Sequence, residues 1–71
     1  MSLSEALRRF RKYVKITQKQ AAEVAGVAER VYQSYEYGKV IPAATVLIAI
    51  ADYFDVSLDY LCGRSDDPAR R

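Results

Sequence analysis

Residue types on which enzyme chemistry often depends are scarce in this chain of 71 residues. It contains no histidine and no tryptophan, and its one cysteine is Cys62. A single cysteine cannot form a disulfide within the chain, and without histidine the chain lacks a common metal ligand and general base. We therefore expect no metal site, no cofactor and no catalytic residues, and we predict that the protein is not an enzyme.

Long apolar runs are also missing. The longest, Val46 to Ala51, ends at Asp52, whereas a membrane span needs about 20 apolar residues. No basic segment followed by an apolar stretch opens the chain, so we recognise no secretory signal. These features predict a soluble, cytoplasmic protein with no membrane partner, and the length fits one small domain.

Charge is distributed unevenly along the chain. Residues 1–40 hold eight Lys or Arg against four Asp or Glu, and residues 41–71 hold three against five. The first part is therefore net positive and the second net negative. A basic part favours a polyanionic partner, although an ordinary solvated helix surface explains such a charge equally well.

Helical spacing of apolar residues, capping residues and glycine stops together predict an all-α fold of five helices, with no strand. The expected helices cover residues 3 to about 14, 18–25, 28–36, 43–54 and 58–62. Ser2 with Glu5 and Thr17 with Gln20 have the form of capping boxes. We expect residues 1–64 to form the domain and residues 65–71 to be a flexible tail or linker.

The predicted core is drawn mainly from the most apolar segment, 43–54. In the helix 28–36, either Val31 or Tyr32 can face inward together with Tyr35. We also expect Tyr13 and Tyr53 to lie beside core positions, with their hydroxyls in water.

Two short segments joined at Gly26, with Ala22 four residues earlier, have the pattern of a helix-turn-helix. A large side chain at Ala22 would push the two helices apart, and a β-carbon at Gly26 would strain a left-handed turn. Alanine four residues before glycine is common by chance. The pattern gains weight from the residues that surround it.

Those residues resemble the lambda-repressor-like helix-turn-helix family, which includes phage repressors, Cro proteins and many XRE-type regulators. The resemblance spans residues 3–65 and rests on ordered matches: the helix 3–14, Ile16-Thr17-Gln18, Ala22, Gly26-Val27, Tyr35-Glu36-Tyr37-Gly38-Lys39, Pro42, the stretch 50–61 and Gly63-Arg64. It implies a compact five-helix domain that binds double-stranded operator DNA, usually as a homodimer, with the helix 28–36 in the major groove.

The resemblance places base contacts on the helix 28–36, at Glu29, Arg30, Gln33 and Ser34. The chemistry fits, since Arg can bind guanine O6 and N7, Gln can bind adenine, and Glu can accept from the cytosine amino group. The family's phosphate contact at the start of the preceding helix falls on Gln18. We also consider Lys19, Lys39 and Arg9 as phosphate contacts, because they are positively charged and lie near the motif. For each of them, an ordinary charge exposed to solvent is the alternative interpretation.

Other positions are interpreted as structural. Arg11 and Glu36 match the family's arginine–glutamate pair, which joins the first helix to the end of the recognition helix. The chain departs from the family pattern at Ala28, where a capping Ser or Thr is common, and at Tyr32, where a smaller aliphatic residue is usual. We expect Ala21 and Ala25 to make room for the Tyr32 ring.

Two functions of different classes remain open. The first is a DNA-binding transcriptional regulator, more often a repressor in this family, whose dimer surface we expect at Val56, Leu58 and Leu61. The second is a protein-interaction module of the same fold, with an antitoxin-like or scaffold role. The modest net charge of +2 and the acidic Glu29 favour the second, which predicts weak, salt-insensitive contact with DNA.

Overall fold

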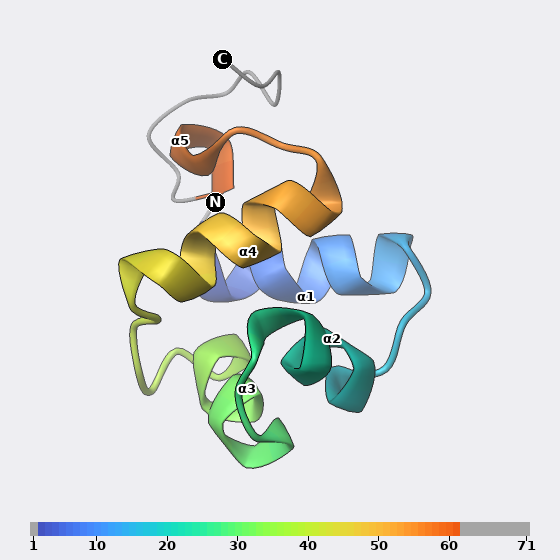
Figure 1. Ribbon diagram of the computed structural model, residues 1–71, viewed down its shortest axis with the longest axis vertical. Coiled ribbons are helices and arrows are strands. Elements are labelled where there is room, and N and C mark those ends of the chain that lie inside the picture. Colours follow the sequence, from blue (N-terminus) through green and yellow to red (C-terminus); the bar gives the residue numbers. More distant parts are fainter. Residues whose placement is uncertain (1, 62–71) are drawn as a thin grey trace.

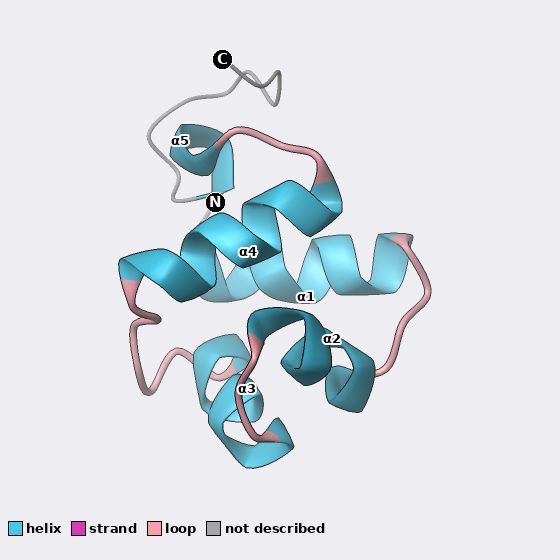
Figure 2. Ribbon diagram, in the orientation of Figure 1, coloured by secondary structure: helices cyan, strands magenta, loops and turns pink. Residues whose placement is uncertain are grey.

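The computed structural model describes residues 2–61, which form a bundle of helices joined by short loops (Figures 1 and 2). Four helices have eight residues or more: α1 (Leu3–Tyr13), α2 (Gln18–Ala25), α3 (Glu29–Glu36) and α4 (Ala44–Phe54). The segment α5 (Leu58–Leu61) adds four residues in helical conformation. The all-α prediction is confirmed within residues 2–61, which contain no strand.

Only part of the prediction for the C-terminal end falls within residues 2–61. The predicted count of five helices is not confirmed, because only a single helical turn, Leu58–Leu61, stands where the fifth helix is predicted. The expected end of that helix at Gly63 lies outside the described residues. The same is true of Cys62 and of the tail 65–71. Within residues 2–61, no helix is long and apolar enough to cross a membrane, and no cluster of side chains could hold a metal ion.

Local hydrogen bonds explain where the helices start. The Ser2 side chain accepts a hydrogen bond from the Glu5 backbone N–H at the start of α1. At α2 the predicted capping box is complete, because Thr17 Oγ1 accepts from the Gln20 backbone at 3.1 Å and Gln20 Oε1 accepts from the Thr17 backbone at 2.9 Å. Ala28 precedes α3 without any side-chain cap, as its sequence predicts.

The core lies where α1, α2, α3 and α4 meet. Fully buried side chains include Leu7 of α1, Tyr32 of α3 and Ile50 of α4. Phe10 packs against Phe54 with ring centroids 5.5 Å apart, which ties α1 to the end of α4. In Figure 1, α4 passes in front of α1, and α2 and α3 lie together below them.

The structure decides which residue of α3 faces inward. Tyr32 is 0% exposed, whereas Val31 is 38% exposed and lies on the outer side. The expectation for Tyr13 is wrong, because Tyr13 stands at the end of α1, where it is 82% exposed.

The predicted dimer surface is also corrected. Val56 is 6% exposed and Leu61 is 0% exposed, and both belong to the core of their own chain. The sequence suggested that the last helix had more apolar surface than it could bury, but both side chains join the core cluster, and α5, which carries Leu61, packs against α1 and α4. The Leu58 side chain lies outside the part that the structure describes.

The two alanines expected to make room for the Tyr32 ring are buried in the same core as Tyr32. Ala21 is 3% exposed and Ala25 is 8% exposed, and Ala21 lines the same apolar hollow as Tyr32, Val24 and Ile50. The Tyr32 hydroxyl, however, is buried without a hydrogen-bond partner of ordinary geometry. Burial raises its pKa, and the nearby Glu36 carboxylate raises it further, so the phenol stays protonated.

We expect Tyr32→Phe to raise the free energy of unfolding by about 1 kcal/mol, because it removes a buried hydroxyl that no partner compensates and keeps the ring. Urea denaturation followed by circular dichroism measures the change. Tyr35→Phe, on the same helix, is the control and should alter stability less. A loss of stability in Tyr32→Phe would show that the hydroxyl does bond to Glu36.

Candidate nucleic-acid interface

The turn between α2 and α3 has the close geometry that the sequence predicts. Gly26 ends α2 in the left-handed conformation with φ of 74°, and the Val27 backbone N–H donates to the Ala22 carbonyl at 3.0 Å. Ala22 is 2% exposed between the helices. A Cβ at Gly26 would meet no other atom within 4 Å, so glycine is favoured there by its positive φ and not by lack of space.

The predicted base-contacting residues divide into two groups. Glu29 and Arg30, in the first turn of α3, are exposed. Gln33 and Ser34, one turn later, are half-buried, and the Ser34 hydroxyl donates to the Val31 carbonyl of its own helix. Arg30 and Glu29 are therefore the residues of this set that are most open to a ligand.

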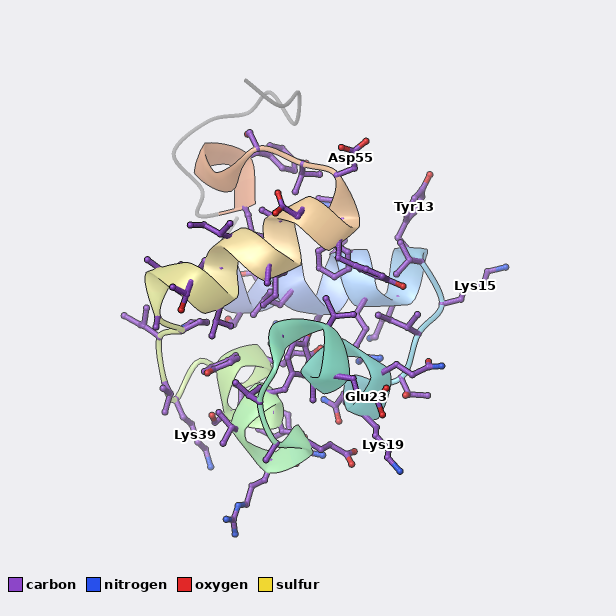
Figure 3. The ribbon with its side chains drawn as sticks, in the orientation of Figure 1. Tyr13, Lys15, Lys19, Glu23, Lys39 and Asp55 are labelled. Atoms are coloured by element: carbon purple, nitrogen blue, oxygen red, sulfur yellow. The ribbon has the colours of Figure 1, made fainter. Side chains whose placement is uncertain are left out.

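The predicted phosphate contacts are dispersed around α3. Lys19 of α2 and Lys39, just after α3, are exposed, and Figure 3 shows both side chains pointing away from the core near α3. One positive charge therefore lies near the start of α2, and the other lies just beyond the end of α3. Arg9 is exposed on α1, and Gln18 is half-buried at the start of α2.

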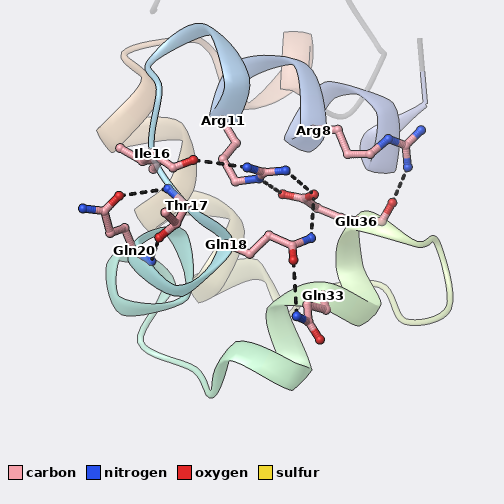
Figure 4. A network of polar contacts seen from close by, with 8 residues as sticks. All are labelled: Arg8, Arg11, Ile16, Thr17, Gln18, Gln20, Gln33 and Glu36. Atoms are coloured by element: carbon pink, nitrogen blue, oxygen red, sulfur yellow. Dashed lines mark hydrogen bonds and ion pairs between the residues drawn. The ribbon is translucent and has the colours of Figure 1, made fainter.

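Arg11 and Glu36 form the ion pair that the family resemblance implies. Arg11 Nε donates to Glu36 Oε2 at 2.6 Å and Arg11 Nη2 donates to Glu36 Oε1 at 3.2 Å (Figure 4). Arg11 Nη1 also donates to the Ile16 carbonyl at 3.1 Å. Glu36 is 1% exposed, so this pair connects α1, the loop before α2 and the end of α3 inside the protein.

The pair alters the ionisation of its carboxylate. Burial by itself raises the pKa of Glu36, but hydrogen bonds from Arg11 and Gln18 outweigh burial and leave its pKa below the ordinary value. Glu36 is therefore a carboxylate at neutral pH. The pKa of Arg11 is raised by its hydrogen bond to Glu36, so the guanidinium stays charged.

Two residues predicted to have separate roles are joined to this pair. Gln18 Nε2 donates to Glu36 Oε1 at 3.1 Å, and Gln33 Nε2 donates to Gln18 Oε1 at 3.2 Å (Figure 4). The family resemblance assigns a phosphate contact to Gln18 and a base contact to Gln33, which lie on different helices. Their direct contact could not be seen from spacing along the chain.

Arg8 is not among the predicted site residues. Its guanidinium donates to the backbone carbonyl of Glu36, at the end of α3 (Figure 4). Since Arg8 and Arg11 are three residues apart, they share one face of α1. This spacing is the signal that could have indicated a second arginine directed at α3.

Comparison with known proteins agrees with this geometry. A family model described as helix-turn-helix matches residues 7–61, which include the whole of α2, the turn and α3. The chain belongs to the helix-turn-helix family. Among structures, this helix-turn-helix domain is similar to the P22 c2 repressor in complex with a synthetic operator, with a TM-score of 0.84 and 26% identity over 92% of this chain and 98% of that one.

Curated relatives of this helix-turn-helix chain are named as regulators. One is an uncharacterized HTH-type transcriptional regulator of Bacillus subtilis, YobD, which is 41% identical over 90% of this chain. Another is the cryptic phage CTXphi transcriptional repressor RstR of Vibrio cholerae, which is 39% identical over 90% of this chain. The chain spans 57% of the length of each of these relatives.

Proposed function

We propose that this protein is a sequence-specific DNA-binding regulator of transcription, with repression as its mode, that inserts α3 in the major groove of an operator. The observation that carries the proposal is the start of α3. Its backbone N–H groups have no side-chain cap, Glu29 and Arg30 are exposed there, and Lys19 and Lys39 flank the motif. Uncapped N–H groups at a helix start favour an anion such as a phosphate.

Each exposed residue has a role in this proposal. Arg30 would bind guanine through O6 and N7, and Glu29 would accept from a cytosine amino group. Ser34 would be a weaker base contact, because its hydroxyl already donates to Val31. Lys19 and Lys39 would bind phosphates that hold the helix in register, and Arg9 would add a contact from α1.

We also propose that two copies bind together as a homodimer on an inverted repeat, with half-site centres about 34–36 Å apart. The support is the family resemblance, which implies binding as a homodimer, and the exposed apolar surface that this chain retains. Among the described residues, Val40 and Ile41 between α3 and α4 are 51% and 83% exposed, and Ile48 of α4 is 49% exposed. This surface takes the place of Val56 and Leu61, which are buried.

The test is selection of bound duplexes from a random DNA library at about 150 mM salt, followed by sequencing of the enriched pool. We expect an enriched inverted repeat. Affinity for it should fall as salt rises: three Lys or Arg contacts per copy give a slope of about −2.7 in a plot of log affinity against log salt for one copy, and about twice that for a dimer.

The alternative is a protein-interaction module of the same fold, and the acidic Glu29 at the start of α3 is the observation that favours it. That function predicts no enriched sequence and weak, salt-insensitive binding. Either result would overturn the DNA-binding proposal. Lys19→Met gives a matched check, because loss of one phosphate contact should reduce the salt slope by about 1 per copy and leave the enriched sequence unchanged.

A further inference from the structure

Two residues other than glycine have a left-handed backbone in the part of the chain that the structure describes. They are Lys15, just after α1, with φ of 61°, and Asp55, at the end of α4, with φ of 55°. Apart from glycine, only Asn and Asp adopt this conformation readily. Asp55 fits that preference, and it also takes part in an interaction within the protein. The conformational preferences of the residues therefore leave Lys15 as the exception.

The turn that contains Lys15 depends on its backbone and not on its side chain. The Lys15 N–H donates to the Lys12 carbonyl and the Ile16 N–H donates to the Arg11 carbonyl, both at 3.2 Å. Glycine would make the same hydrogen bonds without strain. Within residues 2–61, the exposed Lys15 side chain has no hydrogen bond or ion pair. An unfavourable backbone that brings no contact within the fold points to a function outside it.

Lys15 lies at one end of the candidate interface. It stands two residues before Thr17, the residue that caps α2. Figure 3 shows Lys15 and Lys39 on opposite sides of the domain, each with its side chain pointing outward. Lys39 is followed by Val40 and Ile41, which belong to the proposed dimer surface. When two copies meet at that surface, in the centre of the inverted repeat, Lys15 lies at the outer end of each copy.

We propose that Lys15 binds a backbone phosphate of the DNA that flanks the inverted repeat, and that the strained backbone is kept for this contact. This inference rests on the proposed function. A compact ammonium on a flexible stem suits a phosphate contact that carries no base preference. Lys15 becomes a fourth cationic contact per copy. The slope of log affinity against log salt therefore steepens from about −2.7 to about −3.6 per copy on DNA that includes the flanks.

This assignment predicts opposite effects of one substitution on folding and on binding. Lys15→Gly removes the strain and the charge together. We expect its Tm, followed by circular dichroism, to rise by about 4–8 °C. On DNA with flanks, its salt slope should be less steep by about 0.9 per copy. A lysine with no DNA contact would give the same rise in Tm and leave the salt slope unchanged.

Two duplexes separate the flanking contact from the contacts within the repeat. The short duplex ends at the outer edges of the enriched inverted repeat, and the long one extends about 10 base pairs, one helical turn, beyond each edge. Affinity is measured by fluorescence anisotropy at about 50 and 200 mM salt. We expect the unsubstituted protein to prefer the long duplex, and this preference to fall about 3.5-fold per copy between the two salt concentrations. Lys15→Gly should lose the preference.

Three further variants show whether the charge is responsible. Lys15→Asn removes the charge and keeps a residue that tolerates the left-handed backbone, so it should lose the preference as Lys15→Gly does. Lys15→Arg keeps the charge and should keep the preference. Lys19→Met should weaken binding to the two duplexes by the same factor, because its proposed contact lies within the repeat. Urea denaturation confirms that each variant is folded.

The outcomes distinguish this inference from the proposed function. If the unsubstituted protein enriches no sequence, the proposed function fails and the inference fails with it. If a sequence is enriched but the two duplexes bind equally, or Lys15→Gly keeps the preference for the long one, only the inference is overturned. A preference lost in Lys15→Gly and kept in Lys15→Asn would assign the effect to the backbone, and would also overturn it.

Discussion

Replacing Arg11 by Met is expected to lower the free energy of unfolding by about 3–5 kcal/mol at pH 7, the cost of leaving one partner of a buried ion pair uncompensated. Glu36 is 1% exposed and receives two hydrogen bonds from Arg11. A domain of this size has a total stability near the lower end of about 5–15 kcal/mol. A large fraction of Arg11→Met molecules should therefore be unfolded, as urea denaturation would show.

The pH dependence of this effect gives a sharper test. In the unsubstituted protein the pKa of Glu36 is below its ordinary value. Its contribution to stability is therefore present above the unfolded pKa of about 4.3 and is lost as pH falls through the folded pKa. In Arg11→Met, burial is left to raise the pKa of Glu36, so the carboxyl binds a proton more readily when folded than when unfolded. The deficit in stability should be largest at pH 7 and shrink toward pH 4.

The matched control is the double variant Arg11→Met/Glu36→Met, which replaces the whole pair by apolar side chains of similar length. Such a replacement is often neutral or stabilising. We expect it to recover most of the stability lost in Arg11→Met, with no dependence on pH between 4 and 7 from this site. Equal stability of the single and double variants would contradict the assignment of the loss to an uncompensated Glu36.

The second large effect is expected at Arg30. Arg30→Ala should lower affinity for the enriched duplex by about 5- to 150-fold and remove the preference for guanine at one position, because a bidentate contact to guanine is lost. Arg30 is exposed in the first turn of α3, so the free energy of unfolding should change by less than about 0.5 kcal/mol. Affinity is measured by fluorescence anisotropy with the enriched duplex and single-base variants of it.

Arg30→Lys separates geometry from charge. Lysine keeps the positive charge but lacks the planar fork of donors, so most of the guanine preference should be lost while the salt dependence is kept. If Arg30→Ala weakens all duplexes by the same factor, Arg30 contacts a phosphate and does not read a base. In that case Glu29 becomes the leading base contact at the start of α3.

Local signals were enough to predict most of the helical structure. The capping box at Thr17 and Gln20, the left-handed turn at Gly26 and the uncapped start at Ala28 are all present as predicted. These features depend on residues within four positions of one another, and short-range hydrogen bonds and backbone preferences determine them. For the same reason the ends of α1 to α4 agree with the prediction within one or two residues.

Burial was less predictable, because it depends on which elements meet. An apolar pattern at Val56 and Leu61 cannot reveal whether a partner subunit or the same chain covers them, and here both are buried in the core of their own chain. Val31 and Tyr32 are adjacent, and either could have faced the core by its hydrophobicity. The packing of α3 against α1 and α2 leaves the larger ring inside.

The amino-acid sequence by itself determined the helix-turn-helix and the exposed residues at the start of α3, since capping, glycine geometry and helical period act over a few residues. It also indicated the Arg11–Glu36 pair, through resemblance to a family. Only the tertiary structure decided that Gln18 and Gln33 meet, 15 residues apart in the chain, and that Arg8 reaches the end of α3. Such contacts depend on the angle between packed helices, and that angle is set by the shape of the whole core.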